Sequence, residues 1–109
     1  MANLTPKSLY IGNASSGDIY TTANVSGNYT IIKSINICNT SSSDDVCSIH
    51  LLVGAATAAA NNKVISNATV HANNVLYYNT AIVVPANSKI YVSQSSTNCT
   101  FVLSGVEYA

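Results

Sequence analysis

The strongest constraint on the fold of this chain is an alternation of β-branched and polar residues that recurs between turn residues. The clearest stretch is YTIIKSINICN, residues 29–39. Successive side chains of a strand point to opposite faces of a sheet. The period places Ile31, Lys33, Ile35 and Ile37 on one face, and Ile32, Ser34, Asn36 and Cys38 on the other. We expect the face with Ile35 and Ile37 to be buried.

Three further stretches follow the same period. Residues 46–54, VCSIHLLVG, come after the polar tip NTSSSDD, residues 39–45, and are predicted to be the return strand of a hairpin. In this strand Cys47, Ile49, Leu51 and Val53 form the apolar face, and Ser48, His50 and Leu52 form the opposite one. Residues 83–92, VVPANSKIYV, indicate a second hairpin with a Pro-Ala-Asn-Ser turn. The predicted core-facing residues of the last two strands are Ile90, Val92, Cys99, Phe101 and Leu103.

Turn residues return at intervals of roughly 8–12, which is typical of a sandwich or a small barrel. We therefore predict an all-β fold, a single antiparallel β-sandwich of about 7–8 strands, immunoglobulin-like or jelly-roll-like. The length of 109 residues fits one domain, with residues 1–7 as a candidate N-terminal arm. The alanine-rich stretch 54–63 has no amphipathic stripe, so we expect a loop across one end of the sandwich with one short helical turn near 56–61.

Charge excludes several classes of partner. Only 7% of the residues are charged, the net charge is zero, and the basic residues are all lysines. A nucleic-acid-binding protein needs a basic patch, and so does a module that binds a membrane surface, so neither partner is expected. The sequence contains no run of about 18 apolar residues, so no membrane-spanning helix is expected. The N-terminal residues lack the apolar core of a secretory signal. Neutral surfaces tend to associate, which favours a homo-oligomer.

The cysteines, histidines and acids do not form a recognisable site. Three cysteines are an odd number, and the alternation puts Cys38 and Cys47 on opposite faces, although a bulge near the tip would allow them to pair. Cys47 and His50 are also on opposite faces, so no metal site is expected. Asp44 and Asp45 are interpreted as solvated acids at the tip.

Catalytic chemistry is not expected either. His50 and His71 are the only histidines, and neither lies in a known nucleophile or metal motif. We predict that the protein is not an enzyme and needs no cofactor. His50 is expected to point outward from its strand or to lie at an intermolecular contact.

Exposed tyrosines are favoured at protein interfaces, because a large ring carries a polar hydroxyl at little entropic cost. Tyr77 and Tyr78 are adjacent on a strand, so one should face inward and one outward, and Tyr91 should face outward. The candidate protein–protein contacts are Asn39, Ser42, Asp44 and Asp45 in the polar tip, Ala58 and Asn61 in the alanine-rich loop, and Tyr78 and Tyr91.

The pattern as a whole resembles small virion structural proteins of tailed bacteriophages. The matching residues are 31–40, which read I-x-K-x-I-x-I-x-N-T, and 46–53, 85–92 and 104–107, the last reading S-G-V-E. The resemblance implies a β-sandwich in the virion that contacts other virion proteins at the head, neck, collar or tail, and it carries over no catalytic residue. One departure is asparagine where glycine is expected in turns, at Asn73-Asn74 and Asn87. Asparagine tolerates the left-handed conformation, so these turns should survive.

Two functional hypotheses follow. The first is a many-copy structural protein of a phage particle, which decorates or joins capsid, neck, collar or tail proteins. The alternative is a receptor- or carbohydrate-binding module on a phage fibre or appendage, in which tyrosines and asparagines contact sugars. The absence of tryptophan counts against the alternative.

Overall fold

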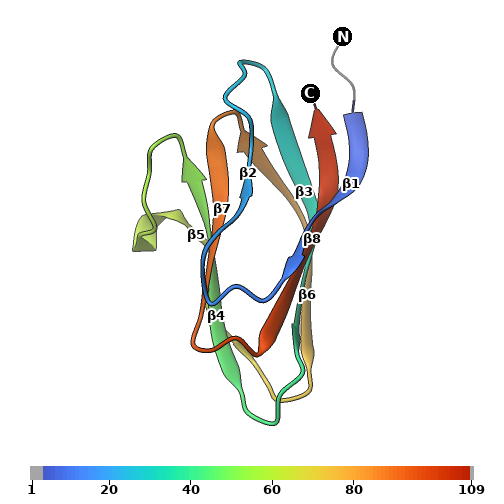
Figure 1. The fold of residues 1–109 in the computed structure, drawn as a ribbon, viewed down its shortest axis with the longest axis vertical. Helices are drawn as coiled ribbons and strands as arrows, with labels where there is room; N and C mark the ends of the chain where they lie inside the picture. Colours follow the sequence, from blue (N-terminus) through green and yellow to red (C-terminus); the bar gives the residue numbers. More distant parts are fainter. Residues whose placement is uncertain (1–3, 109) are drawn as a thin grey trace.

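The computed structural model describes residues 4–108, and apart from one short 3-10 turn its regular elements are all strands (Figure 1). Two four-stranded antiparallel sheets face each other, which confirms the predicted all-β sandwich. Sheet A has the order β1-β8-β3-β6, and sheet B has the order β2-β7-β4-β5. The strands are β1 (Leu4–Gly12), β2 (Ser16–Thr21), β3 (Tyr29–Asn39), β4 (Asp45–Val53), β5 (Lys63–Val70), β6 (Val75–Pro85), β7 (Ser88–Gln94) and β8 (Cys99–Tyr108).

The pairing scheme is that of a jelly roll and not that of an immunoglobulin fold. The antiparallel partners are β1 with β8, β2 with β7, β3 with β6, and β4 with β5. The chain therefore behaves as one long antiparallel ribbon. The ribbon wraps so that β3 also pairs with β8 and β4 also pairs with β7.

The two predicted hairpins are wrong. Strands β3 and β4 lie in opposite sheets, and so do β6 and β7. Residues 40–44 therefore form a corner between the sheets, and Ala86 and Asn87 form a tighter one. A turn between two apolar runs has the same sequence pattern in a hairpin and in a corner, so only the pairing with distant strands distinguishes them. Of the consecutive strands, only β4 and β5 are neighbours within one sheet.

The predicted core of β3 is only partly correct. Ile35 and Ile37 are buried, but the register of β3 against β8 shifts between Ile32 and Ser34, so Lys33 is the extra residue of a β-bulge in that pairing. An extra residue reverses the alternation on one side of it. Ile32 is consequently buried in the core, and Ile31 points outward.

The core between the sheets contains the predicted residues of β7 and β8 (Ile90, Val92, Cys99, Phe101 and Leu103), all fully buried. On β4, Cys47 and Ile49 are buried as expected, but Val53 is exposed and Leu52 is buried in its place. Asn73 and Asn87 have φ values of 56°, so both asparagines do occupy the left-handed conformation in their turns.

Two other predictions concern the termini and the alanine-rich loop. Leu4–Lys7 belong to β1 and pair with β8, so from Leu4 onward the candidate arm is part of the protein's own sheet, while residues 1–3 lie outside the described residues. The helical turn is a single 3-10 turn, η1 (Ala60–Asn62). The loop does not cross the end of the sandwich but lies beside β5 (Figure 1).

Gly105 makes the central pairing of sheet A possible. It lies opposite Ile32 at the bulge, and a Cβ at this position would overlap the carbonyl oxygen of Ile31. The overlapping atom belongs to the backbone of a central strand, which cannot move aside without disturbing both pairings of β3.

Replacing Gly105 by alanine should therefore lower the free energy of unfolding, by about 1–3 kcal/mol as in other overpacked sites. Urea denaturation followed by circular dichroism measures the change. Ser8→Ala, an exposed substitution on the neighbouring strand, is the control and should change the stability by less than about 0.5 kcal/mol. A Gly105→Ala protein as stable as the wild type would contradict the proposed close approach.

Candidate functional site

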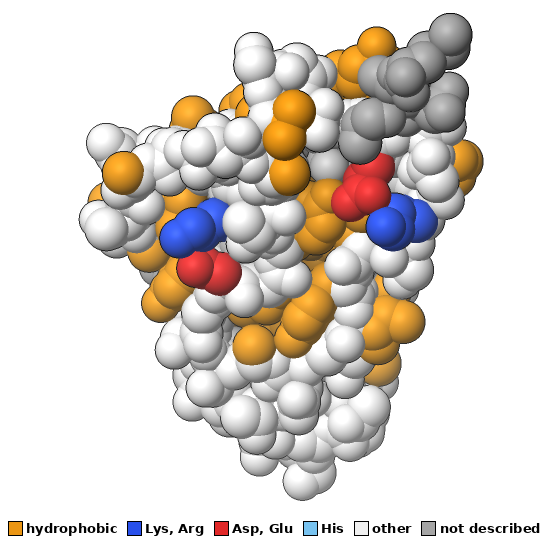
Figure 2. All heavy atoms as spheres, turned by 45° about the horizontal axis from the view of Figure 1, so that its top comes forward, with side chains coloured by type: hydrophobic (Ala, Val, Ile, Leu, Met, Phe, Trp, Pro, Cys, Tyr) orange, Lys and Arg blue, Asp and Glu red, His pale blue; other side chains and the backbone are white. Residues whose placement is uncertain are grey.

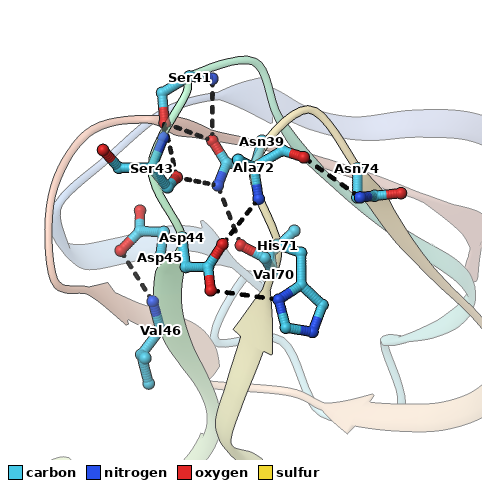
Figure 3. Close-up of polar contacts among 10 residues, drawn as sticks. All are labelled: Asn39, Ser41, Ser43, Asp44, Asp45, Val46, Val70, His71, Ala72 and Asn74. Carbon is cyan, nitrogen blue, oxygen red and sulfur yellow. Dashed lines mark hydrogen bonds and ion pairs between the residues drawn. The ribbon is translucent and has the colours of Figure 1, made fainter.

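The corner at residues 39–45 forms a hydrogen-bonded polar end of the sandwich (Figure 3). Asn39 was predicted as a surface contact, but its side chain is buried. Its amide nitrogen donates to the carbonyls of Ser43 at 2.8 Å and of Val70 at 3.0 Å. Its carbonyl oxygen accepts from the backbone nitrogen of Ser41 at 3.0 Å. Asn39 therefore shapes the corner and offers no surface to a partner.

Asp45 was predicted as a solvated acid, and this prediction is wrong. The residue is only 1% exposed. Its carboxylate accepts hydrogen bonds from the hydroxyls of Ser95 and Ser96 and from the backbone nitrogen of Val46. Burial would raise the pKa of Asp45, but these hydrogen bonds outweigh it and hold the pKa below its usual value. Asp45 thus fastens the β7–β8 loop to the corner.

Asp44 and Ser42 do lie on the surface, as predicted. Asp44 accepts a hydrogen bond from the backbone nitrogen of Ala72 at 2.9 Å and from His71 Nδ1 at 3.2 Å. These two bonds, the backbone one first, lower the pKa of Asp44. Asp44 therefore joins the corner to the β5–β6 loop.

The cysteines are all free thiols. Cys38 and Cys47 are separated because their strands lie in opposite sheets. The sequence analysis had separated them for another reason, namely that they would face opposite sides of one hairpin. Burial, with the Asp45 charge as a second cause, raises the pKa of Cys47 to about 11 and that of Cys99 to about 12. Since the thiolate is the reactive form, these two thiols are unreactive near neutral pH.

His50 points outward from β4, as predicted, but it is covered. Asn62 Oδ1 accepts a hydrogen bond from His50 Nδ1 at 2.6 Å, and the ring of Tyr91 meets the imidazole edge to face at 5.6 Å. The end of the alanine-rich loop thus covers His50 on the outer face of sheet B. Within residues 4–108, no three His, Cys, Asp or Glu side chains converge as a metal site would require.

The outer face of sheet A is apolar, and the sequence analysis did not predict it. The strand register aligns residues in rows that run from β1 through β8 and β3 to β6. The rows are Leu4, Tyr108, Tyr29, Pro85; then Pro6, Val106, Ile31, Val83; then Ser8, Ser104, Ser34, Asn79; then Ile11, Val102, Asn36, Tyr77. In the central strands β3 and β8, the residues that alternate with them are buried (Thr30, Ile32, Ile35, Phe101 and Leu103), so these rows face outward.

Exposure in these rows is high for apolar side chains. Leu4, Ile11, Tyr77 and Val83 are each more than half exposed. Of the charged residues in these strands, Lys7 and Glu107 pair with each other, which leaves Lys33 at the bulge as the charge on this face. A sheet face this apolar usually marks a contact with another molecule. The sequence does contain an indication of this face: β3, β6 and β8 carry apolar side chains on both of their faces. This pattern is typical of strands that are covered on both sides.

The outer face of sheet B is polar by contrast. Its rows hold Ser16, Ser93 and Ser48, then Asp18, Tyr91 and His50, then Thr21, Lys89 and Leu52, and Leu52 is buried. Lys89 pairs with Asp18 at 3.5 Å. Tyr91 faces outward as predicted but is half-buried, while Ala58 and Asn61 are exposed in the loop beside this sheet. Tyr78 packs against the core, and Tyr77 is the outward member of that pair.

A hollow of about 250 Å³ lies at the end of the sandwich where β2, β3 and β8 meet. It is lined by Tyr20, Thr21, Thr22, Ala23, Asn28, Tyr29, Thr30, Glu107 and Tyr108. Figure 2 shows hydrophobic side chains gathered between two lysine–carboxylate pairs on this side of the molecule. The lining comes from residues 20–30 and from residues 107–108 at the other end of the chain, which is why the sequence did not indicate the hollow.

The floor of the hollow is a hydrogen-bonded chain of side chains. Tyr20 donates its hydroxyl proton to Glu107 and lies 2.7 Å from the hydroxyl of Thr30. Lys7 Nζ donates to the other oxygen of the Glu107 carboxylate at 3.0 Å. Burial, followed by the bond to Glu107, raises the pKa of Tyr20 to about 12. The hydrogen bond from Tyr20, followed by the lysine, lowers the pKa of Glu107 despite its partial burial.

Comparisons with protein-family models, with curated proteins and with solved structures found no match for this chain. In residues 4–108 there is no helix with the length and apolar character needed to cross a membrane.

The buried carboxylate of Asp45 makes a prediction about acid stability. Its pKa in the folded protein is below the unfolded value, so its contribution is complete above the unfolded pKa and is lost as the pH falls through the folded pKa. We expect Asp45→Asn to lower the free energy of unfolding at pH 7 by about 1.5–3 kcal/mol, the value for hydrogen bonds to a charged group. The difference from the wild type should shrink as the pH falls below about 4.

The matched control is Asp44→Asn, which removes an exposed carboxylate from the same corner and should have a smaller effect. Urea denaturation at several pH values between neutral and acidic measures both variants. Equal effects of the two substitutions at pH 7 would contradict the special role of Asp45.

Proposed function

We propose that this protein is a many-copy structural protein of a phage particle that docks through the outer face of sheet A. The observation that carries the proposal is the row pattern of this face, with exposed Ile11, Tyr77 and Val83 and a single charge at Lys33. Its neighbours would be other virion proteins, including further copies of the chain. No catalytic role and no cofactor belong to the proposal.

The size of the face supports a role in an array. Four strands spaced about 4.8 Å apart, with rows over about eight residues at about 3.3 Å each, give roughly 500 Å² of flat area. A stable pair of proteins buries about 800 Å² per partner. One such contact is therefore weak, and many simultaneous contacts on a particle would make it effective.

The neutral charge and the fold are consistent with the same role. A net charge of zero means that neighbouring copies would not repel one another. Double-sheet jelly rolls occur in viral capsid proteins, and also in lectins, so the fold is an analogy that does not decide between the two roles. The virion location rests on the sequence resemblance at residues 31–40, 46–53, 85–92 and 104–107.

The test is to place a charge on the apolar face. Tyr77→Lys or Val83→Lys should weaken self-association at least about tenfold and reduce the amount of protein bound to purified particles, because a buried charge costs more than the 1.4 kcal/mol that a factor of ten represents. Sedimentation equilibrium at high protein concentration measures the first effect, and mass spectrometry of particles measures the second.

Val53→Lys is the matched control, since Val53 is equally exposed but belongs to sheet B. Circular dichroism should be unchanged in all three variants. The proposal fails if the wild type stays monomeric and is absent from particles, or if the control weakens association as much as the two test substitutions.

The second candidate function is a receptor- or carbohydrate-binding module. The observation that favours it is the hollow beside Glu107, which Tyr20 and Asn28 also line. Tyr91 is a weaker candidate, because its ring is packed against His50.

A further inference from the structure

We infer that the free edge of β6 pairs with the β6 edge of a second copy, so that the two sheets A join into one antiparallel sheet about a two-fold axis. This contact differs from docking through the outer face of sheet A, because it uses backbone groups at the side of the sheet and requires no virion role. The inference rests on three properties of β6. The strand lacks the features that block pairing, its outer backbone groups are free, and its sequence is complementary to itself.

The other edge strands of the described sheets, β1, β2 and β5, carry features that prevent pairing with another chain. Proline, charge, short length and breaks in the extended backbone all have this effect. β1 contains Pro6 and Lys7, and β2 has six residues and includes Asp18. β5 begins at Lys63 and contains Asn67 at a φ of 48°. β6 has eleven residues without a charged side chain, and its proline is the last of them.

The free edge of β6 is regular, although the pairing with β3 shifts register between Ile82 and Asn79. More exposed and less exposed residues alternate from Val75 to Val83 without a break, so the shift does not interrupt the edge. The charge of Lys33 lies one strand away. In a pair of copies the two lysines would be separated by three strand spacings, about 14 Å, which exceeds the Debye length of about 8 Å.

The N–H and C=O groups of alternate residues of β6 point away from β3. Asn39 N donates to the carbonyl oxygen of Asn74 at 2.9 Å. A trans peptide directs the N–H of the next residue to the opposite side, and the direction alternates along an extended strand. The residues that present both groups to the free edge are Val75, Tyr77, Asn79, Ala81 and Val83. Among residues 4–108, none of the backbone hydrogen bonds outside the strand ladders involves residues 75–84.

The sequence of β6 is complementary to itself in an antiparallel pairing centred on Thr80. This register places Tyr77 opposite Val83 of the partner subunit on the outer face, and Tyr78 opposite Ile82 of the partner subunit on the inner face. Pairs of an aromatic and a β-branched side chain stabilise antiparallel strands. The same register forms about eight backbone hydrogen bonds, which is within the usual range of about ten for a protein interface.

The inner side of the free edge adds apolar surface to the contact. A groove of about 140 Å³ lies there between β5 and β6. Ile65 of β5 lines it together with Tyr78 and Ile82 of β6, and all three side chains are only half-buried. A second β6 would cover Tyr78 and Ile82, so the pairing also removes apolar area from water.

The first experiment is disulfide cross-linking of Thr80→Cys, since Thr80 lies on the two-fold axis and faces Thr80 of the partner subunit. Facing residues of this kind have Cα atoms about 4.5 Å apart, within the range of about 4.4–6.8 Å that a disulfide spans. Oxidised glutathione should convert most of this variant into a disulfide-linked dimer, which non-reducing electrophoresis detects.

Thr69→Cys is the matched control, because Thr69 is an exposed threonine on the other edge strand of this side, β5. It should stay monomeric at the same protein concentration. So should the wild type, which measures any cross-linking through the native thiol of Cys38.

The second experiment removes a backbone donor. Ala81→Pro takes away the N–H that faces the partner and leaves the bonds to β3 intact, and proline is tolerated on the free side of an edge strand. It should weaken dimerisation at least about tenfold, because the two-fold axis doubles each lost hydrogen bond. Sedimentation equilibrium at up to about 1 mM protein measures dimers with dissociation constants up to that range. Ala81→Thr keeps the N–H and should dimerise as the wild type does, and circular dichroism shows that each variant is folded.

The inference is overturned if Thr80→Cys cross-links no better than Thr69→Cys, or if Ala81→Pro dimerises like Ala81→Thr. It is also overturned if the wild type remains monomeric at about 1 mM, a concentration at which a dimer with a dissociation constant of that size would be detected.

A substitution in β8 separates this contact from docking through the outer face. Tyr77 and Val83 belong to both surfaces, but Val102 lies on the outer face with β3 between it and β6. Val102→Lys should reduce binding to particles and, combined with Thr80→Cys, should still give the cross-linked dimer. Normal cross-linking without any particle binding by the wild type would refute the proposed function alone. Particle binding that Val102→Lys abolishes, without cross-linking of Thr80→Cys, would refute edge pairing alone.

Discussion

The close approach of β3 and β8 at Gly105 is the constraint on which the rest of the structure depends. These two strands form the centre of sheet A, and the absence of a Cβ at Gly105 lets the backbone at Ile31 lie directly over it. The bulge at Lys33 sits beside this point and reverses the alternation of β3. Ile32 is thereby directed into the core, and Ile31 and Ser34 are directed outward. The bulge thus joins two segments of opposite parity in one strand, and this gives both the buried core and the rows of the outer face.

At the polar end of the sandwich, burial affects polar groups and not apolar ones. A corner between two sheets leaves backbone and side-chain polar groups close to the core, where an unpaired group is costly. The buried side chains of Asn39 and Asp45 form hydrogen bonds with these groups, and the exposed side chain of Asp44 forms another. The polar residues of this corner are therefore part of the fold, and only Ser42 and Asp44 remain as surface positions among the contacts predicted there. The asymmetry between the two outer faces then concentrates the proposed assembly contact on sheet A.

The two proposed roles use different parts of one molecule. Assembly needs a broad surface with exposed apolar side chains and little charge, and the outer face of sheet A has apolar rows and a single charge at Lys33. Ligand binding needs a small concave space with fixed polar groups, and such a space lies where Glu107, Tyr20 and Thr30 meet. A jelly roll can hold both, because its sheets provide faces and the ends of its strands provide hollows.

The sequence by itself determined the fold class and much of the core. Alternation and turn spacing depend on local geometry, so the strands and the burial of Ile35, Ile37, Phe101 and Leu103 could be predicted. Only the tertiary structure decided which strands pair. A corner and a hairpin have the same local pattern, and the partner of β3 is β8, far away in the sequence. The bulge at Lys33, the burial of Asp45 and the hollow beside Glu107 follow from those long-range pairings. They could not be read from residues that lie next to one another in the chain.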